Sequence, residues 1–247
     1  SGLERGLLNR ELKDRIMVPF CPESILSGIG NTDFMPAVWY RREVDLPEDW
    51  TGRKALFHFQ ACDYDTTVWV NGVQVGWHRG GFTPFTFDLK GIADPGEKAV
   101  IVVRARDDFR RTPQPRGKQS PRYENFSCLY TRTTGIWQTV WLEPVPETYL
   151  RRPRITPDVG RSLFHVQAPL SGNASGLRLR AVLKDGLGVV SQAECAAAED
   201  FTPALDLFIP ETRRRLWEPG SPFLYDLDLE LVDLAGNVVD RAYCYAG

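Results

Sequence analysis

Alternating hydrophobic and polar residues dominate this chain, and the alternation predicts β-strands. In the segment 225–231 every second residue is hydrophobic, and Asp226, Asp228 and Glu230 lie between them. Because successive side chains of a strand point to opposite faces, this pattern is typical of a strand with one buried face. The same alternation occurs in five further segments: 38–46, 99–106, 136–143, 177–183 and 205–209.

Turn residues separate these segments. The 18 prolines and 21 glycines interrupt the pattern at roughly the 8–12-residue spacing of β-sandwiches. The dipeptide Asn71-Gly72 between VWV and VQV predicts a hairpin, since a type I′ turn needs positive φ at both central residues. Helical periodicity is nearly absent, so we predict an all-β fold.

A proline-rich segment divides the chain near residues 146–150. The sequence EPVPETYLRRPRITP carries four prolines between strand-like pieces, and prolines mark sheet edges or linkers because they cannot donate to a central ladder. We therefore predict two domains, residues 1–147 and 148–247. The second, with about 100 residues, has the size of an immunoglobulin-like sandwich.

Charge and composition exclude several classes of partner. The net charge of −2 gives no electrostatic basis for binding nucleic acid or an anionic membrane, and no apolar run approaches the ~20 residues of a membrane span. Five widely spread cysteines without a CxxC pair, together with a start that lacks a signal-peptide pattern, predict reduced thiols in a cytoplasmic protein. The three histidines have no metal-ligand spacing, so neither a metal nor a cofactor is expected.

Two polar loops are candidates for binding. The sequence GWHRGGFTPF predicts a loop with Trp77, His78 and Arg79 at its exposed tip, where an indole can stack on a pyranose ring; alternatively, the phenylalanines that follow pin the loop while these residues face water. The segment 116–143 begins as a long polar loop, which in a compact domain is usually functional or disordered. Its side chains suit hydrogen bonds to hydroxyls: Arg116, Lys118, Gln119, Arg122, Tyr123, Tyr130 and Arg132.

Carboxylate pairs and nucleophile motifs give little support for catalysis. The aspartates of Asp63-Tyr64-Asp65 and of Asp107-Asp108 can contact sugar or Ca²⁺, but residues of this kind at strand ends more often form turns. The sequence has no Gly-x-Ser-x-Gly elbow and no phosphate-binding loop before a helix.

Several segments together resemble the N-terminal region of glycoside hydrolase family 2, which includes β-galactosidases, β-glucuronidases and β-mannosidases. They are PFCPESILSGIG, the stretch from VWYRREVDL to GGFTPFTFDL, PRGKQ, TGIWQTVWLEPVPETYL, RITPD and LWEPGSPFLYDLDLEL. The resemblance implies a sugar-binding jelly roll followed by an immunoglobulin-like sandwich. In that family a (β/α)₈ barrel comes next and holds two catalytic glutamates about 5 Å apart, the geometry of a retaining mechanism.

The resemblance assigns no catalytic residue to this chain. The family's acid/base follows an asparagine, and no asparagine here precedes a glutamate. The chain is therefore expected to be a truncated form or fragment, the non-catalytic front of a β-glycosidase that shapes the substrate pocket, supports the missing barrel and can mediate homo-oligomer contacts. Relatives can place an aspartate in the loop before Gly135-Ile136. The matching SCLYTRTT has no carboxylate and offers Tyr130 and Arg132, which leaves the sugar open.

Two alternatives remain at this point: a stand-alone carbohydrate-binding module, and a β-sandwich that binds other proteins. The length of the native reading frame, glycan binding by the chain alone and its sedimentation distinguish them. Without a barrel the chain is expected to expose apolar surface, to which Trp137 and Trp141 can contribute.

Overall fold

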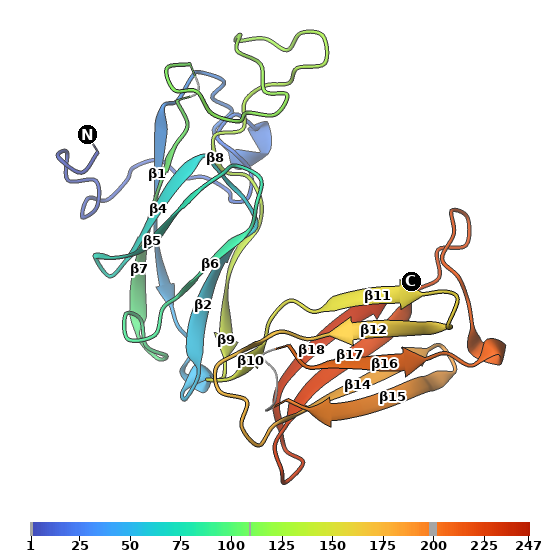
Figure 1. Ribbon diagram of the computed structural model, residues 1–247. Helices are drawn as coiled ribbons and strands as arrows, with labels where there is room; N and C mark the ends of the chain where they lie inside the picture. The colour runs from blue at the N-terminus through green and yellow to red at the C-terminus, as the bar shows by residue number, and fades with distance from the viewer. Residues whose placement is uncertain (1, 109, 198–201) are drawn as a thin grey trace. The chain divides into compact units, whose positions relative to one another are not determined.

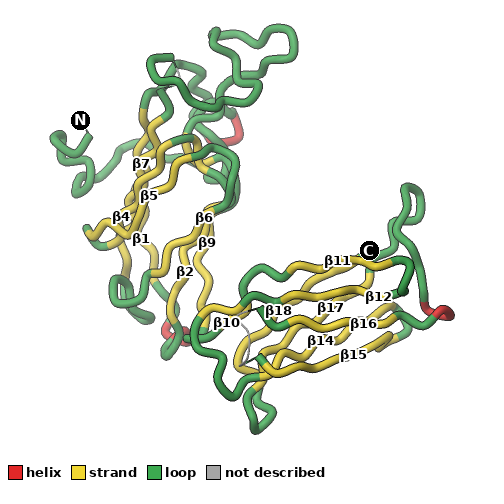
Figure 2. Tube along the Cα trace, viewed as in Figure 1, coloured by secondary structure: helices red, strands yellow, loops and turns green. Residues whose placement is uncertain are grey.

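The computed structural model describes residues 2–108, 110–197 and 202–247. The chain divides into two compact units, Ser1–Pro144 and Val145–Gly247. The described residues form β-strands, with three short 3₁₀ helices and no α-helix among them (Figures 1 and 2). The predicted all-β fold, a jelly roll followed by an immunoglobulin-like sandwich, is confirmed.

The first unit contains a four-stranded sheet in the order β1-β7-β4-β5, a three-stranded sheet β6-β2-β9 and a two-stranded sheet β3-β8. Its elements are η1 (Ile25–Ser27), β1 (Ala37–Asp45), η2 (Glu48–Trp50), β2 (Lys54–Phe59), β3 (Cys62–Asp63), β4 (Asp65–Val70), β5 (Val73–Arg79), β6 (Phe85–Asp88), β7 (Lys98–Arg106), β8 (Gly135–Ile136) and β9 (Val140–Val145).

The core of the first unit joins the two larger sheets. The hydrophobic residues that alternate along β7, including Ile101 and Val103, are buried together with Phe57 and Phe59 of β2. Phe59 is fully buried and stacks on Phe85 of β6 with ring centroids 4.7 Å apart. The alternation in the sequence therefore identified the core face of this sheet.

The hairpin expected at Asn71-Gly72 is confirmed. Asn71 has φ 49° and Gly72 has φ 80°, as a type I′ turn requires, and β4 and β5 pair antiparallel on either side. The Asn71 side chain donates to the Ile92 carbonyl and accepts from the Val100 amide, both at 2.9 Å. The turn is thus fixed to its neighbours as well as by its own backbone.

The prediction of a single strand over residues 136–143 is wrong. The structure has two strands there, β8 and β9, separated by residues 137–139. Trp137 directly follows β8, and its indole N–H donates to the Gly81 carbonyl at 2.8 Å.

The second unit has a four-stranded sheet β15-β14-β17-β18, a three-stranded sheet β11-β12-β16 and a two-stranded sheet β10-β13. Side chains of β14 and β17 such as Leu183 and Leu227 are fully buried in its core. Its elements are β10 (Tyr149–Leu150), β11 (Arg154–Asp158), β12 (Leu163–Gln167), β13 (Leu170–Ser171), β14 (Arg178–Asp185), β15 (Gly188–Ala196), β16 (Ala204–Phe208), η3 (Glu211–Arg213), β17 (Tyr225–Val232) and β18 (Val238–Ala246).

Candidate functional site

A long loop of residues 107–134 connects β7 to β8. Figure 1 shows it, in green, at the end of the first unit where η1 also lies. This loop contains most of the residues that the sequence predicted to face a ligand. Three buried carboxylates bond to side chains or amides of the loop: Asp63 of β3, Glu23 of the segment before η1, and Asp107 at the start of the loop itself.

Asp63 is the central anchor. This residue ends β3 and is 1% exposed. Gln119 Nε2 donates to Asp63 Oδ2 at 2.7 Å, and Gln119 Oε1 accepts from the Thr133 amide at 3.0 Å. A Cβ at Gly81 would lie 2.4 Å from Asp63 Oδ1, so the backbone of residue 81 passes directly over the carboxyl group. Gln119 uses its amide inside the protein and is not available to a ligand.

Glu23 binds the end of the loop, and Asp107 forms a hydrogen bond within its start. Glu23 accepts hydrogen bonds from the backbone amide of Thr134 at 3.1 Å and from its hydroxyl at 2.6 Å. Asp107 Oδ1 accepts from Gln114 Nε2 at 2.6 Å. Glu23 thus joins two segments that are far apart in the sequence, and Asp107 stabilises the start of the loop.

Burial changes the protonation of these anchors. It raises the pKa of Asp63 to about 6, against an ordinary value of 3.8. Burial, reinforced by the charge of Asp63, raises the pKa of Asp107 to about 7, and burial also raises that of Glu23. The neighbouring groups that act on these pKa values are amides, hydroxyls, the Cys21 thiol and the other acids of the network. The network therefore favours neutral carboxyl groups.

These acids do not form a metal site. Among the described residues, no group of three or more His, Cys, Asp or Glu side chains is placed to hold a metal ion. In the same part of the chain, no helix is long and apolar enough to cross a membrane. All five cysteines are free thiols.

Arg132 lies inside the loop, contrary to the expectation that it faces sugar or a barrel. It is 2% exposed, and its guanidinium donates to the carbonyls of Thr32, Ser120 and Arg122. The same group lies 4.1 Å from the centroid of the Phe34 ring. Main-chain carbonyls and an aromatic face thus satisfy the charge internally, so Arg132 organises the loop rather than meeting a ligand.

Tyr130 remains accessible, with 42% of its surface exposed. A Cβ at Gly117 would lie 3.4 Å from the Tyr130 hydroxyl and 3.2 Å from the Phe82 ring, so both side chains approach residue 117 closely. Phe82 is 46% exposed and meets Trp137 edge-on at 6.1 Å. We call Phe82, Tyr130 and Trp137 the aromatic rim. The exposed rings of Phe82 and Tyr130 suit stacking on the apolar face of a sugar, and Trp137 is half-buried behind Phe82.

Trp77, His78 and Arg79 do not form a loop tip. They lie within β5, because pairing with β4 continues as far as Asp65 opposite Arg79. His78 stacks on Phe85 at 4.2 Å, and burial lowers its pKa. Trp77 is 64% exposed, and the Arg79 guanidinium lies 2.9 Å from the Asp65 carboxylate. The prediction of a tip is wrong; Trp77 and Arg79 are exposed on β5, and His78 is half-buried.

The comparisons with known proteins agree with this architecture. Residues 27–142 match the model described as glycosyl hydrolases family 2, sugar binding domain, and residues 148–247 match the model of glycosyl hydrolases family 2. The two matches follow one another along the chain. The chain belongs to glycosyl hydrolase family 2.

Curated relatives of this family 2 chain include glycosidases. The β-glucuronidase of Paenibacillus borealis is 26% identical over 260 residues, covering 100% of this chain and 42% of the relative. The β-galactosidase of Thermoanaerobacter pseudethanolicus is 24% identical, covering 81% of this chain and 26% of the relative. A solved structure of β-glucuronidase from Ruminococcus gnavus, in complex with uronic deoxynojirimycin, has the same fold, with a TM-score of 0.75 and 22% identity. The match covers 100% of this chain and 42% of that one. This chain thus spans well under half the length of these relatives.

Proposed function

We propose that this chain is the non-catalytic front part of a retaining β-glycosidase and that the full protein acts on a β-glucuronide. The observation that carries the proposal is the match with the P. borealis β-glucuronidase, which covers the whole chain but 42% of that enzyme. The catalytic glutamates then belong to a (β/α)₈ barrel elsewhere in the protein. The two β-units support that barrel and shape the mouth of its pocket.

The long loop is the part of the first unit best suited to that role. Tyr130 of this loop and Phe82 of the neighbouring β5–β6 connection are accessible, while Gln119 and Arg132 of the loop are buried and hydrogen-bonded. A loop backbone fixed in this way loses little freedom when a ligand arrives, which favours binding. The aromatic rim can therefore hold a substrate ring at the entrance without taking part in bond cleavage.

The test compares the natural full-length protein with the 247-residue chain, using p-nitrophenyl β-glucuronide, β-galactoside and β-mannoside. The full-length protein is expected to hydrolyse the glucuronide fastest, and the chain alone none of them. Hydrolysis by the chain alone, or by neither protein, would overturn the proposal.

A variant separates the role of the rim from that of the fold. In the full-length protein, Tyr130→Ala is expected to raise KM about tenfold, equivalent to about 1.4 kcal/mol of lost binding, with little change in kcat. Tyr243→Ala, which removes a ring that is 72% exposed on β18, is the matched control and is expected to leave both constants unchanged. Equal effects of the two substitutions would remove the rim from the binding site.

A further inference from the structure

The long loop 107–134 is basic, although the chain as a whole is slightly acidic. The loop contains six cationic and three acidic residues, a net charge of +3, whereas the whole chain has a net charge of −2. Four of the six cationic side chains are exposed: Arg110, Arg111, Lys118 and Arg122. A surface with an excess of one sign of charge attracts ligands of the opposite sign. The loop therefore favours an anionic ligand.

Three of the exposed cations have no acidic partner. In the part of the chain that the structure describes, Arg110, Lys118 and Arg122 form no ion pair. The guanidinium groups of Arg110 and Arg122 lie over the rings of Phe34 and Phe126, at 4.3 and 4.1 Å from the ring centroids. Each of the three cations can therefore meet an anionic ligand without first giving up a carboxylate.

Lys118 lies beside the aromatic rim, and its backbone is fixed there. Its carbonyl accepts a hydrogen bond from the Tyr130 amide at 2.9 Å, and the Tyr130 carbonyl accepts one from the Ser120 amide at 2.6 Å. The residue before Lys118 is Gly117, which both Phe82 and Tyr130 approach closely. A cation next to exposed rings can pair with the charge of an acidic sugar while a ring stacks on the apolar face of that sugar.

Arg122 supplies a second cation on the same segment. The Ser120 hydroxyl accepts from the Arg122 amide at 3.1 Å and donates to the Glu124 carbonyl at 2.8 Å, and the Arg132 guanidinium donates to the Arg122 carbonyl. The backbone at Arg122 is therefore fixed as well. Lys118 and Arg122 are four residues apart, at most about 14 Å along the chain, which is wider than one sugar ring. Two cations at this separation suit the charges of an oligosaccharide.

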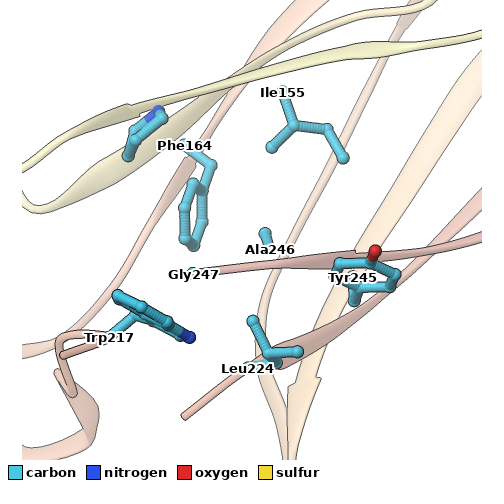
Figure 3. A pocket seen from close by; sticks show the side chains of 8 residues that line it. Ile155, Phe164, Trp217, Leu224, Tyr245, Ala246 and Gly247 are labelled. Carbon is cyan, nitrogen blue, oxygen red and sulfur yellow. The ribbon is translucent and has the colours of Figure 1, made fainter. Parts of the chain in front are cut away.

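The groove on the second unit has different chemistry. Its volume is about 320 Å³, and it is lined by apolar and aromatic side chains that include Ile155, Phe164, Trp217, Leu224 and Tyr245 (Figure 3). None of the residues that line this groove is charged. Trp217 is 50% exposed, so the groove adds to the exposed apolar surface expected at Trp141, which is 37% exposed. An acidic ligand is therefore expected on the basic loop rather than in this groove.

We propose that Lys118 and Arg122 bind the anionic groups of an acidic oligosaccharide, one ring of which stacks on Tyr130. For the full protein, the leaving group of the β-glucuronide is then itself an acidic sugar chain, and this part of the inference rests on the proposed function. The anionic group is a carboxylate or a sulfate, because both accept charge-assisted hydrogen bonds from ammonium and guanidinium groups.

Isothermal titration calorimetry of the 247-residue chain tests the binding. The probes are a hyaluronan tetrasaccharide, which contains β-glucuronate, the same tetrasaccharide with its carboxylates reduced to alcohols, and a chondroitin sulfate tetrasaccharide. At low ionic strength the acidic probes are expected to bind about tenfold more tightly than the reduced one, and added salt should weaken their binding alone. Comparison of the two acidic probes shows whether the site prefers a carboxylate or a sulfate.

Three variants separate the charge from the ring. Lys118→Gln should weaken binding of the acidic probes about threefold and leave that of the reduced probe unchanged, because it removes only the charge. Tyr130→Ala should weaken the binding of all three probes, since stacking does not require a charge. The matched control is Arg53→Gln, at an exposed cation between η2 and β2 of the same unit, and it should change none of the affinities. An Arg53→Gln effect as large as that of Lys118→Gln would show that overall charge attracts the probes, and the proposal would be wrong.

The remaining outcomes separate this inference from the proposed function. Equal affinity for the acidic and the reduced tetrasaccharide, or binding of neither, overturns this inference alone, whatever the full-length protein hydrolyses. Equal affinity for a single-stranded oligonucleotide would reveal a general polyanion surface and would also overturn the assignment to a glycan. If the chain binds the acidic probes selectively but the full-length protein hydrolyses no β-glucuronide, the proposed function fails and the binding site stands.

Discussion

The buried carboxyl groups of the first unit should make it more stable in mild acid than in mild base. Burial raises the pKa of Asp63 to about 6 and that of Asp107 to about 7, both above the ordinary 3.8. A group whose pKa is higher in the folded state binds more protons there than in the unfolded state. Its contribution to stability is complete below the unfolded value of 3.8 and is lost as the pH rises through 6 and 7.

The magnitude follows from these values. Between pH 8 and pH 5, a carboxyl group with a folded pKa of about 6 gains roughly 1.4 kcal/mol of stability and one with a pKa of about 7 gains roughly 2.7 kcal/mol. The two gains overlap, because the charge of Asp63 contributes to the shift of Asp107. We therefore expect the free energy of unfolding to be about 2–4 kcal/mol larger at pH 5 than at pH 8, or roughly 5–15 °C in Tm.

Urea unfolding followed by tryptophan fluorescence measures this difference, since six of the seven tryptophans belong to the first unit. Asp107→Asn keeps an acceptor for Gln114 and removes the ionisation, so it should abolish more than half of the difference between the two pH values. Asp45→Asn, at an exposed carboxylate on β1, should leave it unchanged. Stability that is equal or greater at pH 8, or an Asp107→Asn variant with the wild-type dependence, would refute the reasoning.

Three further substitutions test other parts of the structure. Gln119→Ala removes an amide that is 1% exposed and makes two hydrogen bonds, and should lower the free energy of unfolding by about 2–3 kcal/mol in urea; a loss below about 0.5 kcal/mol would mean that water replaces it. Gly76→Ala places a Cβ 2.2 Å from the Phe87 ring and should lower the free energy of unfolding by about 1–3 kcal/mol, measured by thermal unfolding. Gly186→Ala is the control, because a Cβ there has nothing within 4 Å, and it should be nearly neutral. Similar effects of the two substitutions would contradict the close approach of Gly76 to Phe87. The Tyr225 hydroxyl donates to the Arg213 carbonyl and accepts from the Arg215 amide, both at 2.7 Å. Tyr225→Phe should cost about 1–3 kcal/mol and speed amide exchange in the loop before it, and unchanged exchange would show that its hydroxyl does not hold that loop.

The sequence predicted the features that depend on neighbouring residues. Alternation identified the buried faces of β7 and β17, where Val103 is 3% exposed and Leu227 fully buried, because a strand with one buried face requires this pattern. The Asn71-Gly72 hairpin was predictable for the same reason, since its backbone conformation is a local property of two residues.

The candidate site was predicted only in outline. The sequence does not show whether a polar residue faces water or another part of the chain. Arg132 and Gln119 were therefore predicted to be accessible, but both are buried. Asp63 was interpreted as a turn residue, but its partner lies 56 positions away; Glu23 bonds to a residue 111 positions away and gave no signal. Such long-range pairs become visible only when the strands bring them together.

The hairpin at Asn71 also has a consequence for the chemical ageing of the protein. In a flexible peptide, an asparagine followed by glycine loses ammonia easily, because the next backbone nitrogen can attack the side-chain carbonyl. Here both ends of the Asn71 carboxamide are engaged, by the Ile92 carbonyl and the Val100 amide, and these hydrogen bonds must break before the side chain can turn toward Gly72. Isoaspartate at position 71 should therefore accumulate mainly while the molecule is unfolded. The amount of isoaspartate would then measure how long the hairpin has been open.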